Sequence, residues 1–245
     1  MNNHLKIIAL KVARDGKEII RGVDLEIAPG DVVALMGPNG SGKSTLAGAL
    51  MGHPDCVITA GKILIDGEDM TDKSPDKRAK AGLFLSMQSP PEIPGLTVTS
   101  FLRAAFNEIH DEQIRPLDFR HSLQEKADLL KMNPELLSRG LNEGFSGGER
   151  KKSEILQLMV LAPKYAILDE TDSGLDVDAL KAVGEGINTA RGDADEGLGI
   201  LVITHHQKLL EYLQPTRVII LRDGLIEKEG GPDLAQEIER SGFES

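Results

Sequence analysis

The first part of the chain, residues 5–36, has the pattern of strands joined by tight turns. Val23, Leu25 and Ile27 alternate with polar residues, and a period of two predicts a half-buried strand. A Pro-Gly turn follows, and then the unbroken apolar run Val32–Met36. Such a run is typical of a strand buried on both faces of a parallel sheet. The sequence therefore predicts a β-rich beginning that leads into a buried core strand.

The pattern then changes twice. After a glycine-rich loop we expect a helix over Lys43–Met51 that stops at Gly52, because glycine favours helix ends. A short strand is expected over Lys62–Asp66. From about residue 75 to residue 162 the apolar spacing is near three and four, which is typical of helices. The helices expected in this region are Thr99–Ile109, Asp118–Lys131 and Glu149–Leu161.

The last third returns to alternating strands and helices. Buried strands are expected over Ala166–Leu168, Ile200–Thr204 and Val218–Leu221. Asp176 is placed as the N-cap of a helix over Val177–Ala190, and Arg191–Gly199 is most simply a solvated loop. Together these elements predict an α/β protein whose parallel-sheet core is interrupted by a helical lobe.

Composition narrows the classes of partner. The 245 residues are enough for one sizeable domain. The net charge of −11 repels a phosphate backbone, so nucleic acid is disfavoured as a partner. No apolar run is long enough for a signal peptide or a membrane span. The single cysteine, Cys56, cannot form an internal disulfide or supply a metal site alone. We expect a cytoplasmic protein without membrane insertion.

A glycine-rich loop carries the strongest chemical signal. It fits the pattern G-x-x-x-x-G-K-[ST] and consists of Gly37, Pro38, Asn39, Gly40, Ser41, Gly42, Lys43, Ser44 and Thr45. In such a loop backbone N–H groups surround a phosphate, Lys43 reaches its charge, and the Ser44 hydroxyl can bind Mg²⁺. A chance glycine-rich turn is the alternative. The strand before the loop and the helix after it favour a phosphate site.

Two acids follow the apolar run at the end of the expected strand 166–168. Asp169 is expected to hold Mg²⁺, directly or through water, because a phosphate loop needs a carboxylate to complete its metal site. Glu170 is expected to point at the water that attacks the γ-phosphate. A solvated strand end is the alternative for two adjacent acids, but the phosphate loop in the same chain disfavours it.

A second candidate phosphate site lies at Ser146-Gly147-Gly148, which opens the helix expected over Glu149–Leu161. Glycine pairs before helices are common caps, so the motif alone is weak evidence. One chain with two phosphate sites suggests a sandwich, in which the loop of one copy and the Ser-Gly-Gly helix of another hold one nucleotide between them. This arrangement predicts nucleotide-dependent self-association.

Two single residues complete the candidate site. Gln88 follows the apolar segment 83–87 at the entrance to the helical lobe, and its amide could reach both Mg²⁺ and the attacking water. Alone, a glutamine is more often merely solvated. His205 follows the strand expected over Ile200–Thr204 and could contact the γ-phosphate, whereas His206 is interpreted as structural or exposed.

In this order along the whole chain, the residues resemble the ATP-binding cassette (ABC) family. The matching positions are Lys43 and Ser44 in its Walker A motif, Gln88 in its Q-loop, Ser146-Gly147-Gly148 in its signature, Asp169 and Glu170 in its Walker B motif, Asp176 in its D-loop and His205 as its switch histidine. The resemblance implies that ATP is bound by the loop 37–45, the signature and Asp176. It implies catalysis by Glu170, His205 and Gln88, with Mg²⁺ at Ser44, Gln88 and Asp169.

The resemblance also implies a fold. It is that of a P-loop NTPase with a RecA-like parallel-sheet core, an N-terminal antiparallel β portion and an inserted helical subdomain. We expect a single ABC ATPase domain over residues 1–245, with the α/β catalytic core in 1–87 and 162–245 and the helical subdomain in 88–161.

Departures from transporter cassettes narrow the resemblance. The chain has FSGGE and DETDSGLD where transporter cassettes usually have LSGGQ and DEPTSALD, and the stretches 88–95, 142–145 and 153–157 are also distinctive. These resemble the SufC family, the ATPases of the Suf iron–sulfur cluster assembly machinery. That resemblance implies partners of the SufB and SufD scaffold type, which would carry the cluster ligands.

Two rival functions stay open at this point. One is the ATPase of a membrane permease, and the other is a nucleotide-dependent clamp that binds without useful turnover. Many cassettes place an aromatic side chain near 12–14 to stack on adenine, and this chain has Val12-Ala13-Arg14. Base selectivity is therefore expected to be weak.

The segment Gln88–Phe106 is the expected docking surface for a partner helix. Its prolines stiffen the backbone and block a regular helix until Thr97. Its expected exposed apolar side chains are Met87, Ile93, Leu96 and Phe101. The alternative is that Leu96, Phe101 and Phe106 pack the core of the helical lobe itself.

Overall fold

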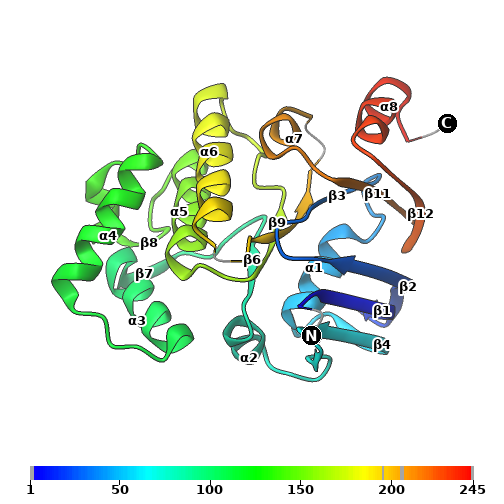
Figure 1. Cartoon of the computed structure of the whole chain (residues 1–245), viewed down its shortest axis with the longest axis horizontal. Helices are drawn as coiled ribbons and strands as arrows, with labels where there is room; N and C mark the ends of the chain where they lie inside the picture. The colour runs from blue at the N-terminus through cyan, green and yellow to red at the C-terminus, as the bar shows by residue number, and fades with distance from the viewer. Residues whose placement is uncertain (1–2, 195, 205–206, 244–245) are drawn as a thin grey trace.

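The computed structural model describes residues 3–194, 196–204 and 207–243. Figure 1 shows strands β1, β2 and β4 at one end of the molecule, a central sheet, and helices α3 and α4 at the opposite end. Within the described ranges, no helix is long and apolar enough to cross a membrane.

A mixed sheet of six strands, counted over the described ranges, forms the centre. In spatial order its strands are β12 (Leu225–Gly230), β11 (Arg217–Arg222), β3 (Val32–Met36), β10 (Gly199–Ile203), β9 (Tyr165–Asp169) and β6 (Leu83–Ser86). All neighbours are parallel except β11 and β12. Every residue of β3, β9 and β10 is buried, as their unbroken apolar runs predict. The expected parallel-sheet core is therefore confirmed.

An antiparallel sheet lies beside this core. Its spatial order is β2 (Lys17–Ile27), β1 (Leu5–Arg14), β4 (Val57–Ile65) and β5 (Glu68–Asp69). The strand expected over Lys62–Asp66 is longer than predicted and begins at Val57. Inward-facing side chains of this sheet share one apolar cluster with the mixed sheet and with α1 (Lys43–Met51). That helix ends at Gly52, as expected, with the glycine in the left-handed conformation.

A second apolar cluster joins the other face of the mixed sheet to the helical lobe. The lobe contains β7 (Ile93–Thr97), α3 (Val98–His110), α4 (Pro116–Leu129), the 3-10 helix η1 (Pro134–Ser138), β8 (Gly140–Leu141) and α5 (Gly147–Leu161). Helix α6 (Val177–Asp193) packs against α5. Thr97 caps α3, in agreement with the expected start of that helix. The domain boundaries at 87/88 and 161/162 stay a prediction.

Several elements differ from the sequence-based expectation. The region interpreted as helical from residue 75 to 162 also contains strands β6, β7 and β8, because the short strand pairs have no periodicity of their own. The segment interpreted as a loop over Arg191–Gly199 begins with the end of α6, which runs to Asp193. Three short helices were not predicted: α2 (Pro75–Lys80), α7 (Gln207–Leu213) and α8 (Asp233–Ser241).

Helix α2 has a structural role that its sequence did not indicate. Its Arg78 is only 2% exposed. The guanidinium donates to the carbonyl oxygens of Ala49 at 2.6 Å and Leu50 at 2.7 Å. These carbonyls belong to the last turn of α1, where intrahelical partners run out. Arg78 therefore anchors the far end of the helix that the glycine-rich loop begins.

Candidate active site

The glycine-rich loop connects buried strand β3 to helix α1. Gly42 is the N-cap of α1, with a φ of 109° that side-chain-bearing residues rarely adopt. At Gly37 (φ 153°) a Cβ atom would lie 2.1 Å from the Leu221 carbonyl oxygen of β11. Only glycine fits there, because the loop is pressed against the neighbouring strand. The sequence pattern thus produces a tightly folded loop at the N-terminus of a helix, which is the geometry that binds phosphate.

Lys43 lies within this loop. Its Nζ donates to the carbonyl oxygens of Gly37 at 2.8 Å and Pro38 at 3.0 Å, and the residue is 6% exposed. Burial lowers the pKa of the Lys43 ammonium, while the carboxylates of Glu170 and Asp169 act in the opposite direction. A poorly solvated cation at the centre of the loop is suited to binding an anion strongly.

Asp169 ends strand β9 with its carboxylate near Ser44. Burial raises the pKa of Asp169, and a hydrogen bond from the Ser44 side chain opposes this shift. Its Oδ1 atom is buried and has no hydrogen-bond partner among the described residues. A buried carboxylate oxygen left unpaired next to a hydroxyl fits a hard cation, because Mg²⁺ prefers oxygen ligands. The residues present are therefore compatible with the predicted metal.

The structure brings Gln88 and Glu170 together. Gln88 Nε2 donates to Glu170 Oε2 at 2.5 Å, although the residues are 82 positions apart. Glu170 has a φ of 50°, a strained conformation for a residue with a side chain, which is typical of functional positions. Its backbone N–H donates to the Ile203 carbonyl at 2.9 Å, which fixes it at the edge between β9 and β10.

A pocket with a volume of about 390 Å³ opens over the loop. It is lined by Arg14, Asp15, Lys17, Ile19, Asn39, Gly40, Gly42, Lys43, Ser44, Thr45 and Glu170. The sequence analysis did not predict that Arg14, Asp15, Lys17 and Ile19 of the β1–β2 hairpin line the pocket. The turn-forming pair Asp15-Gly16 is the signal that could have indicated this hairpin. No aromatic side chain is among the lining residues just named, and weak base selectivity stays a prediction.

The predicted signature residues occupy a different surface. Ser146, Gly147 and Gly148 are not among the residues that line the pocket. Ser146 caps α5 through a capping box, in which Ser146 Oγ accepts from Glu149 N and Glu149 Oε2 accepts from Ser146 N. The bond from the Ser146 N–H holds the pKa of Glu149 below its ordinary value. One copy therefore does not bring its own signature into this pocket.

Two further predicted site residues remain. Asp176 is the N-cap of α6, as expected, and accepts from Ala179 N at 2.7 Å. Its predicted contact with nucleotide stays a prediction. His205, predicted as a catalytic residue, and His206 lie outside the described residues.

Comparisons with known proteins identify the family. The family model described as "ABC transporter" matches residues 20–173. "Vegetative protein 296" of Bacillus subtilis (strain 168) is 51% identical over 242 residues, which are 98% of this chain and 92% of that protein. A "Probable ABC transporter ATP-binding protein" of Streptococcus pyogenes serotype M3 is 50% identical over 241 residues, 98% of this chain and 93% of that protein.

A solved structure shares the fold. It is a dimeric ATP-binding cassette in a post-hydrolysis state, bound to ADP and Pi. Its TM-score is 0.79 and its identity 21%, over 93% of this chain and 98% of that chain. The chain thus belongs to the ABC transporter family and is an ATP-binding cassette ATPase.

Proposed function

We propose that this ATPase works as a head-to-tail dimer and drives conformational change in a scaffold of the SufB–SufD type during iron–sulfur cluster assembly. The contact between Gln88 and Glu170 supports the proposal that ATP hydrolysis drives a conformational change in the partner. It connects the candidate hydrolytic acid to the first residue of the exposed segment at which a partner is expected to dock. The choice of partner depends on the resemblance of the stretches 88–95, 142–145 and 153–157 to the SufC family.

The proposed chemistry distributes roles over the pocket. Lys43 and the loop N–H groups bind the β- and γ-phosphates. Ser44, Gln88 and Asp169 would hold Mg²⁺, and the metal would supply positive charge against the phosphates. Glu170 orients the attacking water and accepts its proton. Gln88 holds the Glu170 carboxylate in place through the bond described above. His205 is proposed to contact the γ-phosphate.

Self-association completes the proposed site. The Ser146-Gly147-Gly148 segment lies at the N-terminus of α5, and a helix N-terminus favours phosphate. This segment is outside the pocket of its own copy, so a second copy is needed to bring a signature to each nucleotide. The dimeric state of the similar cassette bound to ADP and Pi supports this arrangement. Asp176 follows the Walker B acids and is proposed to contribute at the same junction.

A second function has specific support. Relatives about 50% identical are named ABC transporter ATP-binding proteins, which favours an ATPase that works with a membrane permease. Mass spectrometry of proteins that co-purify with the chain separates the two functions. Scaffold proteins of the SufB–SufD type support the first proposal, whereas a partner with membrane-spanning helices would contradict it and support the second.

The proposed docking surface covers less of α3 than the segment Gln88–Phe106 does, and it begins at Met87. Met87, Ile93 and Leu96 are 41%, 38% and 37% exposed, and we propose that they receive a helix of the scaffold. The expectation that Phe101 is exposed was wrong. Phe101 and Phe106 are half-buried side chains of α3 that pack against the apolar cluster of the helical lobe, and the Phe106 ring lies 6.1 Å from the Phe119 ring of α4.

Replacing Ile93 with aspartate should abolish co-purification with SufB–SufD scaffold proteins. The side chain is already partly in water, so the fold should tolerate the charge, whereas an apolar contact with the partner should not. The matched control is Leu117→Asp on α4, where an apolar side chain is 71% exposed. The control should keep the complex. Retention of the complex by Ile93→Asp with an unchanged Tm would contradict docking at this surface.

A further inference from the structure

Residues 91–97, here called the docking segment, are joined to residues 140–142. β7 pairs with β8 through Ile93 opposite Leu141 and Thr97 opposite Gly140. Asn142 Nδ2 donates to the Pro91 carbonyl oxygen at 3.0 Å. All three links lead to residues 140–142, just before the signature. Movement of the docking segment therefore has a direct structural route to Ser146.

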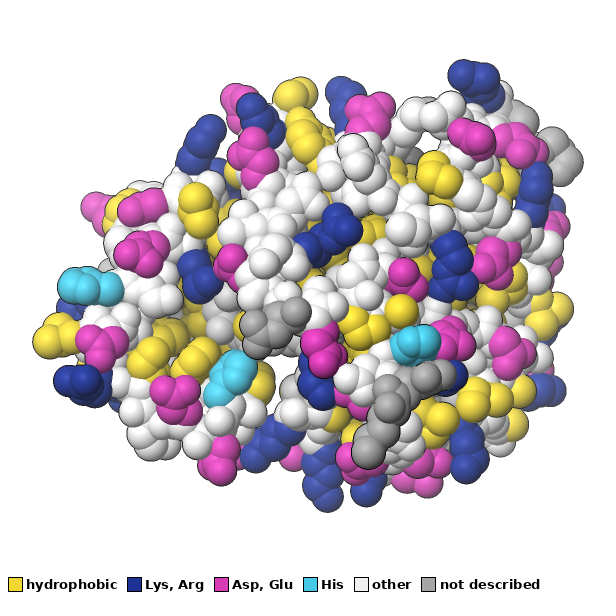
Figure 2. Space-filling model, in the orientation of Figure 1, with side chains coloured by type: hydrophobic (Ala, Val, Ile, Leu, Met, Phe, Trp, Pro, Cys, Tyr) yellow, Lys and Arg dark blue, Asp and Glu magenta, His cyan; other side chains and the backbone are white. Residues whose placement is uncertain are grey.

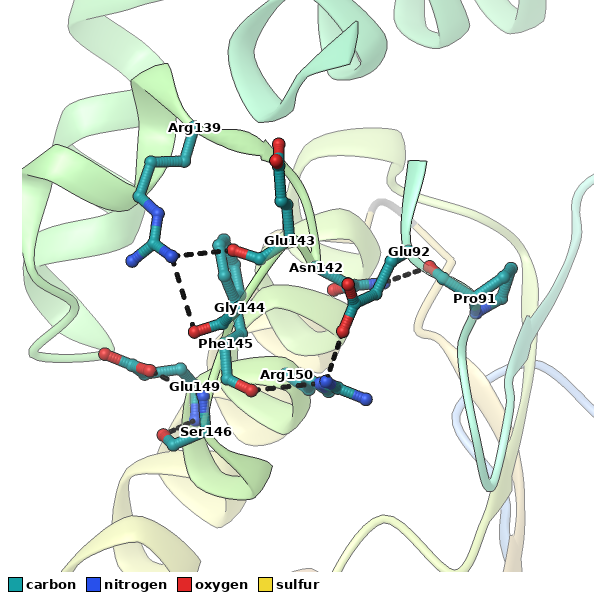
Figure 3. A network of polar contacts seen from close by, with 10 residues as sticks. All are labelled: Pro91, Glu92, Arg139, Asn142, Glu143, Gly144, Phe145, Ser146, Glu149 and Arg150. Atoms are coloured by element: carbon teal, nitrogen blue, oxygen red, sulfur yellow. Dashed lines mark hydrogen bonds and ion pairs between the residues drawn. The ribbon is translucent and has the colours of Figure 1, made fainter. Parts of the chain in front are cut away.

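The Arg150 guanidinium connects the docking segment directly to the turn before Ser146. Arg150 Nη2 donates to Glu92 Oε1 at 2.6 Å, and Arg150 Nε donates to the Phe145 carbonyl oxygen at 3.1 Å. Figure 3 shows Arg150 between the two, with Glu92 on the docking segment and Phe145 immediately before Ser146. The planar guanidinium fixes the relative direction of its donors, so a shift of Glu92 turns the group that holds the Phe145 carbonyl.

The turn before Ser146 is held at its other carbonyls as well. Arg139 Nη2 donates to the carbonyl oxygens of Glu143 at 2.7 Å and Gly144 at 3.4 Å, as Figure 3 also shows. The Arg139 guanidinium lies 5.5 Å from the centre of the Phe145 ring, and Phe145 is buried. The turn is thus a stiff unit, and the bond from Arg150 links it to a side chain of the docking segment.

Gln88 is held independently of Arg150. Lys151 Nζ donates to the carbonyl oxygens of Met87 and Gln88, and Glu154 Oε1 accepts from Met87 N. The Lys151–Glu154 pair is buried, and burial raises the pKa of Glu154. Loss of the Arg150 bridge should therefore leave the Gln88–Glu170 contact and the nucleotide pocket in place.

We propose that Arg150 is a positioning residue that transmits partner docking at 91–97 to the turn before Ser146. This inference rests on the proposed function, since it assumes that the signature serves the nucleotide of a second copy. Docking then sets the position of the Ser146 helix end relative to that nucleotide. The exposed Glu92–Arg150 ion pair, with side chains 43% and 35% exposed, contributes little to folding stability.

The test compares Glu92→Ala, Arg150→Met and the double variant. Two quantities are measured: scaffold-stimulated turnover, and the protein concentration at half-maximal ATP-dependent self-association without scaffold. Each single variant should lower scaffold-stimulated turnover by about three- to tenfold, since directly bonded network residues are strongly coupled. It should raise the concentration at half-maximal self-association by a similar factor. The double variant should be no worse than Arg150→Met. Tm and ATP binding by the monomer should not change.

The control is Lys152→Met on the same helix, whose Nζ contacts the Lys131 carbonyl instead of the docking segment. It should behave as wild type in both assays. Multiplicative effects of the two single variants, or an unchanged self-association midpoint, would overturn the inference. A wild-type chain that scaffold does not stimulate would count against the proposed function instead, and the self-association midpoint would still decide the role of Arg150.

Discussion

Replacing Lys43 with alanine is expected to remove most ATP binding by the isolated chain. The ammonium is buried in the loop beneath the pocket, and burial already lowers its pKa, so its charge is poorly screened by water. Truncating one member of a desolvated charge pair costs about 2–5 kcal/mol. At 1.4 kcal/mol per tenfold change, calorimetry should show affinity reduced roughly 30- to 3,000-fold.

A matched control separates this effect from general charge loss. Lys17 lines the same pocket but is exposed. Lys17→Ala should weaken ATP binding by less than about fivefold, because exposed ion pairs contribute little. Wild-type affinity in Lys43→Ala would show that the loop is not the phosphate site.

Glu170→Gln should keep ATP binding and slow hydrolysis by about 10²–10⁴-fold, the usual contribution of a positioned base. The amide keeps the size of the carboxylate but cannot accept the proton of the attacking water. The contact with Gln88 can persist through the amide oxygen, so the pocket should hold its shape. Turnover and nucleotide affinity are measured on the same preparation.

The control for this variant is Glu185→Gln on α6, where the carboxylate pairs with Lys181 at 3.8 Å on the surface, outside the residues that line the pocket. It should leave turnover unchanged. Undiminished turnover in Glu170→Gln would place the catalytic group elsewhere.

The sequence predicted those parts of the site that depend on local order. The loop 37–45 lies between a buried strand and a helix, so its shape follows from glycine positions and neighbouring elements alone. Asp169 and Glu170 were found from the apolar run that precedes them and from the need of a phosphate loop for a carboxylate. The net charge of −11 is also known from the sequence alone. Its distribution is not, and Figure 2 shows acidic and basic side chains interspersed over one face of the molecule.

Other parts depend on contacts between distant residues. The β7–β8 pairing joins segments more than 40 residues apart through strands of five and two residues, too short for a periodic signal. The bridge from Glu92 through Arg150 to Phe145 depends on that pairing. Likewise, the hairpin that brings Arg14, Lys17 and Ile19 to the pocket depends on how the two sheets pack. Phe101 is half-buried against the apolar cluster of the helical lobe, and this packing between distant elements has no signal in the local sequence.

Each ATPase site is proposed to be built from two copies of the chain. Ser146→Arg places a large cation at the exposed N-cap of α5, so it should block the signature while the pocket of the same copy still binds ATP. Lys43→Ala should lose ATP binding in its own pocket but keep an intact signature. Each variant alone should therefore be inactive.

Mixing the two variants is the most direct measurement. In a mixed head-to-tail dimer, one site combines the intact Lys43 of one copy with the intact Ser146 of the other. With random pairing, roughly a quarter of all sites become complete, and turnover should recover to about that fraction of wild type at equal total concentration. An inactive mixture of two folded variants that still associate would contradict the account, as would full activity of Ser146→Arg alone.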